Sequence, residues 1–207
     1  QSPIGGATGS SFSIAAPASS QMGAYSVLIT NTYGSTISSN ALLAVVPIIA
    51  VGDNSVGQRN VPATTTNAIK IAAGSWHNLA LKSDGKVVAW GNNNNGQCDV
   101  PANLSGAVAI AAGGYHSLAV KANGTIVGWG ADFDGQATPP PLANVVAVAA
   151  GTWHSLALLT DGTVHGWGDD SAGQTDVPTG LGDVIAIAAG GNHSLALQAD
   201  GTVVAWG

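Results

Sequence analysis

Histidine is the first candidate for chemistry in this sequence, because it recurs at a nearly constant spacing. His77, His116, His154 and His193 are separated by 39, 38 and 39 positions. Imidazole is the commonest metal ligand in proteins, and a zinc ligand lies about 2 Å from its ion. Equivalent positions on stacked sheets are about 10 Å apart, which is too far to share one ion. We therefore expect no metal and no cofactor, and interpret the four histidines as structural residues that bond to the backbone of the next repeat.

Carboxylates form the second candidate group. Asp132, Asp134 and the pair Asp169-Asp170 suggest calcium, but the stretch "DFDGQ" lacks the further oxygen ligands and the closing bidentate carboxylate of a calcium loop. The sequence contains no Glu, no nucleophile elbow and no Gly-rich phosphate loop. A glycosidase-like pair of Asp stays open, although nothing singles one out. We expect solvated turn carboxylates and no enzyme.

The residue before each histidine is the third candidate. It is Trp76, Tyr115, Trp153 or Asn192. A position that accepts Asn is unlike a dry core, because a buried amide needs partners. We therefore expect these side chains in the loops between the first and second strands of the repeats, on one face, as candidate ligand-binding residues. The alternative is that they cover the ends of the repeats and touch no ligand.

The elements that position these residues recur four times. Copies of the pattern "AAGxxHSLAL" begin at Ala72, Ala111, Ala149 and Ala188. Each copy predicts an alternating strand, a second strand after the histidine, and a third strand ending in Trp-Gly. Asp-Gly or Asn-Gly joins the last two strands and predicts a hairpin turn in which both residues have positive φ. The "GQxxVP" link predicts a surface connection with one short edge strand.

The recurrent tryptophan predicts how the repeats pack. A three-stranded sheet of this size must cover its faces with neighbouring sheets, and a β-propeller does this. We interpret the tryptophans as structural plates wedged between adjacent sheets. They are Trp90, Trp129, Trp167 and Trp206.

At these residues the sequence resembles a known family. The pattern "AAGxxHSLAL", then "DGTVxxWG", then "GQ", is similar to the repeat of the regulator of chromosome condensation family, over Ile48 to Gly207. Its period looks most like that of bacterial members, among them propeller-type β-lactamase inhibitory proteins. The resemblance implies seven blades, whereas about four are found here. We therefore expect an all-β, partial propeller, truncated at the C-terminus, whose open blade faces favour self-association.

The first 46 residues follow another pattern. The stretch Gly23 to Val45 predicts two strands joined at Asn31–Gly34, and it resembles the C-terminal half of an immunoglobulin-like β-sandwich. Tyr25 would be the tyrosine of the corner and Val27 would stand where a disulfide cysteine often lies. We therefore predict two domains, 1–46 and 47–207.

Composition bounds the partners. Only 8% of the residues are charged and the net charge is −6, which disfavours nucleic acid. No apolar run reaches the length of a membrane span, about 20 residues. We expect a non-catalytic module that presents blade loops to a protein or glycan ligand, in a secreted or surface-anchored bacterial protein. The alternatives are an architectural spacer in a long extracellular chain and an enzyme with catalytic loops in missing blades.

Overall fold

The computed structural model describes residues 23–25, 28–31, 34–37, 41–43 and 48–207, and the chain divides into two compact units, 1–46 and 47–207. In the first unit, β1 (Gly23–Tyr25) pairs antiparallel with β4 (Ala41–Leu43), and β2 (Leu28–Asn31) pairs with β3 (Gly34–Ile37). The immunoglobulin-like assignment stays a prediction, because Val27 and most of residues 1–46 lie outside the described residues.

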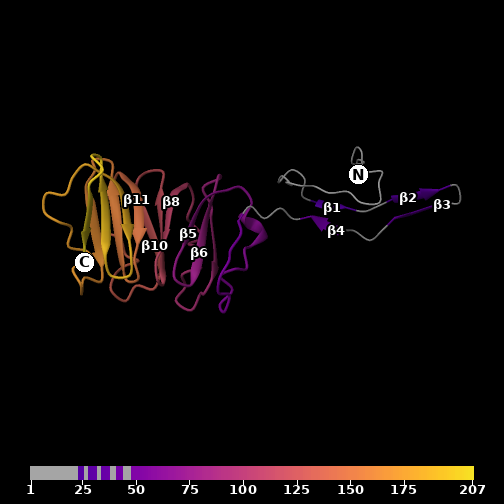
Figure 1. Cartoon of the computed structure of the whole chain (residues 1–207), viewed down its shortest axis with the longest axis horizontal. Coiled ribbons are helices and arrows are strands. Elements are labelled where there is room, and N and C mark those ends of the chain that lie inside the picture. Colours follow the sequence, from indigo (N-terminus) through magenta and orange to yellow (C-terminus); the bar gives the residue numbers. More distant parts are fainter. Residues whose placement is uncertain (1–22, 26–27, 32–33, 38–40, 44–47) are drawn as a thin grey trace. The chain divides into compact units, whose positions relative to one another are not determined.

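The second unit contains four antiparallel sheets of three strands each, which follow one another in chain order (Figure 1). This confirms the all-β, partial-propeller prediction. The described residues contain no helix with the length and apolarity needed to span a membrane. The sheets are β5 (Ala68–Ala73), β6 (His77–Lys82) and β7 (Val87–Gly91); β8 (Ala107–Ala112), β9 (His116–Lys121) and β10 (Ile126–Gly130); β11 (Val145–Ala150), β12 (His154–Leu159) and β13 (Val164–Gly168); β14 (Val184–Ala189), β15 (Ser194–Gln198) and β16 (Val203–Trp206).

The links between the sheets contain turns and no strand, so the predicted edge strand is wrong for residues 92–106, 131–144 and 169–183. Proline and the bonded turns of the link account for this, because they leave no run of backbone free to pair. The link that precedes the first sheet continues into a short 3-10 helix, Ala63–Thr65.

The core lies between neighbouring sheets. Leu79 and Leu81 on β6 are fully buried, and they belong to one cluster with Ala119 and Trp129 of the next sheet. Trp129 is 7% exposed. The first strands of neighbouring sheets also contact one another, so the sheets converge along β5, β8, β11 and β14. Trp129, Trp167 and Trp206 each pack against the sheet before their own.

Backbone hydrogen bonds join the sheets at both edges. At the histidine edge, formed by loops 74–76, 113–115, 151–153 and 190–192, the Ser75 amide donates to the Gly113 carbonyl at 3.2 Å, and the bonds repeat at the next two interfaces. At the turn edge, where the second and third strands meet, the Ala107 amide donates to the Gly85 carbonyl at 3.0 Å. A Cβ on Gly74 would lie 2.4 Å from the Gly113 oxygen, which explains the glycine of the "AAG" motif.

The hairpin turns differ from the prediction. Only the glycine of each Asp-Gly or Asn-Gly pair has positive φ, +75° at Gly85, whereas Asp84 does not. The Lys82 amide donates to the Lys86 carbonyl, and the Asp84 carboxylate accepts from the Lys86 amide at 3.1 Å. The loop is therefore one residue longer than predicted, and a three-residue loop needs only its last residue in the left-handed region.

Candidate functional site

The recurrent histidines bond to serine side chains of the next sheet. His77 Nε2 lies 2.8 Å from Ser117 Oγ, and the same bond joins His116 to Ser155 at 2.8 Å and His154 to Ser194 at 3.0 Å. The prediction of a backbone partner is therefore wrong. Each serine hydroxyl instead donates to a backbone carbonyl, that of Gln97, Gln136 or Gln174, so the histidine reaches the backbone through the serine.

These bonds fix the protonation of the histidines. Ser117 has one hydroxyl proton, which goes to the Gln97 carbonyl, so His77 must donate from Nε2. His77 Nδ1 is buried without a partner and therefore carries no proton. Burial lowers the pKa of His77 and of His116 from 6.5 to about 4 and also lowers that of His154. These imidazoles are neutral at physiological pH.

A histidine within hydrogen-bond reach of a serine also resembles a nucleophile and its base. Ser117 and Ser155 are 0% exposed, so no substrate reaches their hydroxyl groups. The hydroxyl proton is directed at a carbonyl, and no carboxylate orients the Nδ1 atoms of His77 or His116. The arrangement serves as an inter-sheet tie. Among the described residues, no three His, Cys, Asp or Glu side chains gather closely enough to hold a metal ion.

His193 differs from the other three. Its side chain is exposed, and no described serine of a following sheet lies beside it. At the other three positions the partner serine comes from the following sheet.

The tryptophans of the Trp-Gly motif bond to the glutamine of the preceding link. Trp129 Nε1 donates to the Gln97 carbonyl at 2.9 Å, and Trp90, Trp167 and Trp206 donate likewise to Gln58, Gln136 and Gln174. Sequence reasoning treated the "GQ" dipeptide as part of a surface connection. Gln97, Gln136 and Gln174 are instead fully buried. The glutamine is the same in every link, and this invariance is the sequence signal from which its burial could have been predicted.

The loops before the histidines carry a cluster of aromatic rings. Tyr115 and Trp153 stack with centroids 4.7 Å apart and planes at 21°, and Phe133 lies tilted with its centroid 6.1 Å from that of Trp153. We call Tyr115, Phe133 and Trp153 the aromatic cluster. Phe133, which the sequence analysis did not single out, is 76% exposed. It is unique among the links, where Asn94 and Ser171 take its place.

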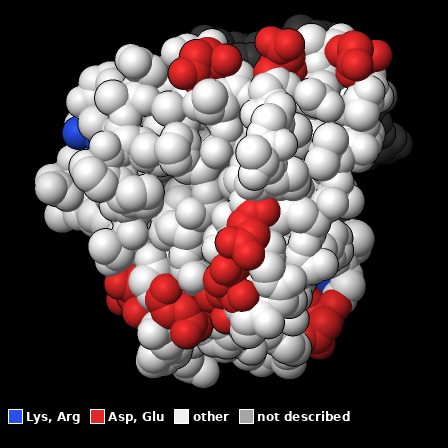
Figure 2. All heavy atoms as spheres, turned by 90° about the vertical axis from the view of Figure 1, so that its left-hand side faces the viewer, with Lys and Arg blue, Asp and Glu red and all other residues white. Residues whose placement is uncertain are grey.

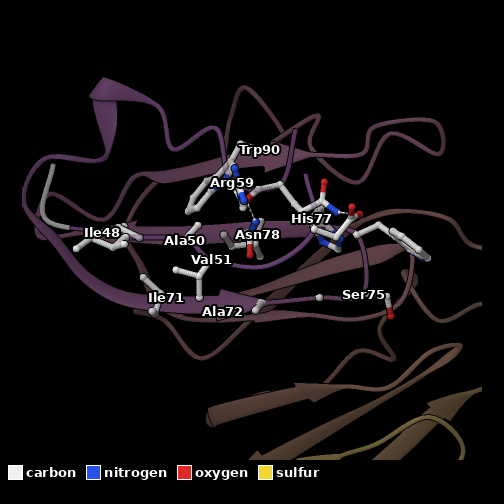
Figure 3. Close-up of a pocket in the computed structure, with 17 residues that line it drawn as sticks. Ile48, Ala50, Val51, Arg59, Ile71, Ala72, Ser75, His77, Asn78 and Trp90 are labelled. Atoms are coloured by element: carbon white, nitrogen blue, oxygen red, sulfur yellow. Dashed lines mark hydrogen bonds between the residues drawn. The ribbon is translucent and has the colours of Figure 1, made fainter. Parts of the chain in front are cut away.

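The predicted row of four residues is only partly brought together. Tyr115 and Trp153 are in contact, whereas Trp76 takes no part in the aromatic pairs of the described residues and Asn192 is exposed one sheet further on. Trp76 instead lines a cavity of about 380 Å³ on the first sheet. Figure 3 shows this cavity, with Val51, Ile71 and Trp90 among the residues that line it.

Backbone hydrogen bonds place carboxylates next to the aromatic cluster. The Ala131 amide donates to the Tyr115 carbonyl and the Asp169 amide to the Trp153 carbonyl, both at 2.9 Å. Each link therefore starts beside an aromatic loop. The first residues of these two links include four carboxylates, Asp132, Asp134, Asp169 and Asp170, which we call the carboxylate rim. All five Lys and Arg residues lie outside these segments.

Hydrogen bonds favour the ionised form of two rim carboxylates, Asp169 and Asp170. The backbone amide of Ser171 lowers the pKa of Asp169, and the Thr175 hydroxyl lowers that of Asp170. Asp132 accepts from the Ala137 amide and the Thr138 hydroxyl. Figure 2, which views the molecule from the side of the C-terminal sheet, shows several Asp patches and hardly any Lys or Arg. The two link segments beside the aromatic cluster therefore carry Asp and no Lys or Arg.

The chain was compared with known families, curated proteins and solved structures. A family model described as the regulator of chromosome condensation (RCC1) repeat matches residues 68–97, 107–136, 145–174 and 184–207. The search of curated proteins returned no match.

Solved propeller structures are similar over most of the chain. Prp20p from Saccharomyces cerevisiae, whose structure was reported with its binding properties to Gsp1p and histones, is 20% identical with a TM-score of 0.62, covering 82% of this chain and 48% of that one. Human WBSCR16 is 26% identical with a TM-score of 0.58, covering 68% and 47%. The ectodomain of the Arabidopsis thaliana receptor kinase ACR4 is 28% identical with a TM-score of 0.55, covering 66% and 49%. The chain spans about half the length of these structures.

Proposed function

Because the chain belongs to the regulator of chromosome condensation (RCC1) repeat family, we propose that it is a non-catalytic binding module that captures a protein partner through the loops of its histidine edge. The observation that carries the proposal is the stack of Tyr115 on Trp153, with Phe133 exposed beside it. The rings come from two successive sheets and a link, so a partner that contacts them bridges two blades.

The energetics favour this cluster as an anchor. Aromatic side chains bring a large contact area for little loss of rotamer entropy, which is why they are enriched at the centres of interfaces. Tyr115 and Trp153 already hold each other in place by stacking, so binding would cost little further ordering. The rigid sheets below, tied by inter-sheet hydrogen bonds, keep the cluster preorganised.

The same geometry argues against catalysis at the recurrent residues. The histidine and serine pairs that could act as base and nucleophile are buried and engaged with carbonyl groups. Binding to other proteins is also reported for the structurally similar Prp20p, with Gsp1p and histones as its partners. For this chain, a secreted or surface-anchored parent protein is part of the proposal, with support from the immunoglobulin-like resemblance of residues 1–46 alone.

The test is a binding screen with a matched control. The full chain is applied to an array of purified proteins and to a glycan array, beside the triple variant Tyr115→Ser, Phe133→Ser and Trp153→Ser. The control variant is Ile69→Ser, Val108→Ser and Ile185→Ser, which removes exposed apolar side chains of the first strands. We expect protein hits that the control keeps and the triple variant loses, with unchanged circular dichroism. Hits that survive in the triple variant would refute the site, and no hits at all would favour the architectural spacer.

A further inference from the structure

The aromatic cluster and the carboxylate rim form one surface. The Ala131 and Asp169 amides hold the starts of two links against the carbonyls of Tyr115 and Trp153, so the rim residues follow directly on the rings in space. Phe133 itself lies between Asp132 and Asp134 in the sequence and contacts Trp153. The rings on the second and third sheets therefore lie beside the starts of the two links that carry the four rim carboxylates.

The chemistry of this surface selects the partner. Lys and Arg side chains combine an apolar stem with a charged head, and guanidinium groups also stack on aromatic faces. A partner side chain of this kind packs its stem on the rings while its head reaches the rim. We propose that the binding surface takes a basic segment of a partner protein, rich in Arg or Lys, at Tyr115, Phe133 and Trp153 with the carboxylate rim around them. This inference rests on the proposed function and specifies its partner.

Charge complementarity supports this occupant over a neutral one. The rim carries four negative charges on link segments that hold no Lys or Arg, and the whole chain carries −6. Such a field draws cations over about 8 Å at physiological ionic strength and gives a neutral glycan no comparable attraction. Tyr115 also covers one face of Trp153, so that ring face is closed to a sugar.

The repeats themselves supply substitutions that remove the charge and keep the fold. Asn92 and Asn93 of the first link stand where the third link has Asp169 and Asp170. Asn93 accepts the hydrogen bond from the Cys98 amide that Asp170 accepts from the Thr175 amide. Asn95 likewise stands in the place of Asp134. The rim variant is therefore Asp132→Asn, Asp134→Asn, Asp169→Asn and Asp170→Asn.

The turn edge offers a control with the same loss of charge. Asp84, Asp161 and Asp200 occupy the turn position that Asn123 fills in the second sheet, and Asp183 occupies the positive-φ position of Asn67 and Asn144. The four carboxylates lie at the turn edge or next to it, at the opposite end of the strands from the aromatic cluster. The control variant is Asp84→Asn, Asp161→Asn, Asp183→Asn and Asp200→Asn.

The experiment measures fluorescence anisotropy of two labelled octapeptides, alternating Arg-Gly and alternating Gln-Gly, with the full chain. We expect the Arg-Gly peptide to bind at least about tenfold more tightly than the Gln-Gly peptide, and more weakly as salt rises. The rim variant, and an aromatic variant with Tyr115→Asn, Phe133→Asn and Trp153→Asn, should each weaken binding about tenfold or more. The turn-edge control should change it less than about twofold.

Each other outcome has a defined meaning. Equal losses in the rim variant and the turn-edge control would show that only the net charge acts, and would overturn the inference. Equal binding of the two peptides would also overturn it. If the array hits depend on the aromatic residues but survive in the rim variant, the inference fails and the proposed function stands. If the hits survive without the aromatic residues, the proposed function itself fails.

Discussion

The imidazole of His116 donates a hydrogen bond of 2.8 Å to the hydroxyl of Ser155, which lies on the next sheet. The ring is fully buried, and burial lowers its pKa from 6.5 to about 4, as it does for His77. An unfolded chain binds a proton at this residue near pH 6.5, whereas the folded chain binds it only near pH 4. Between pH 6.5 and pH 4 the unfolded chain therefore binds more protons than the folded chain, and lowering the pH destabilises the fold.

We predict that the free energy of unfolding is constant above pH 6.5 with respect to these histidines and falls as the pH drops from 6.5 to 4. A fall of up to about 3 kcal/mol for each histidine corresponds to the lowered pKa. Urea titrations at a series of pH values measure it. His116→Gln should make the dependence shallower, because it removes one of the groups whose pKa is lowered by folding. A slope that His116→Gln does not alter contradicts the assignment.

A second prediction concerns Gln136, whose Nε2 is buried without a partner. In the first and third links the same atom donates to Asn92 and Asp169, but the second link has Ala131 at that position. Ala131→Asn should supply the missing acceptor and stabilise the fold by about 1 kcal/mol, measured by thermal unfolding. Ala131→Leu, which adds volume without an acceptor, is the control. Equal effects of the two changes would exclude the hydrogen bond as the cause.

A third prediction separates the core ring from the surface ring. Trp129 is 7% exposed, packs on Leu79 and Leu81, and donates to the Gln97 carbonyl, so Trp129→Ala should cost about 3–5 kcal/mol. Tyr115 is only partly buried and contributes mainly its stack on Trp153, so Tyr115→Ala should cost about 1 kcal/mol. Chemical denaturation compares the two. Similar losses at both positions would contradict this division.

A fourth prediction concerns association. Ile49, Val51 and Ile71 are 86%, 87% and 66% exposed, and Val51 and Ile71 line the cavity on the first sheet. Exposed apolar surface of this kind favours association between molecules in water. We predict that the 207-residue chain associates at high concentration and that Val51→Thr with Ile71→Thr reduces this, as measured by light scattering. The double change Val108→Thr and Val146→Thr, at exposed positions elsewhere, is the control. A chain that stays monomeric at all concentrations would refute the prediction.

The sheets were well predicted from the sequence because the same strand pattern occurs four times. A strand pattern that returns at Ala72, Ala111, Ala149 and Ala188 leaves little room for another interpretation. The turns were less predictable, since Asp84-Gly85 fits two loop lengths that differ by one residue, and only the hydrogen bond between Lys82 and Lys86 distinguishes them.

The candidate site was harder to predict, because it depends on contacts between different repeats. Nothing in the position of Tyr115 indicates that it stacks on Trp153 while Trp76 does not. Phe133 escaped notice because it occurs in one link only, where repetition gives no signal. The serine that bonds to a histidine belongs to the "HS" dipeptide of the next repeat. His77, for example, bonds to Ser117, so the adjacent letters of one repeat do not reveal the pair.

The hydrogen bonds at the histidine edge and the turn edge always join a sheet to its immediate neighbour. Cooperativity in such a molecule passes from one sheet to the next, as in a chain of coupled units. The two middle sheets are held on both sides, whereas the outer sheets are held by described residues mainly on one side. Amide hydrogen exchange should therefore show graded protection, slowest in β9 and β12 and fastest in β15, and a pulling force should peel the outer sheets away before the inner pair separates.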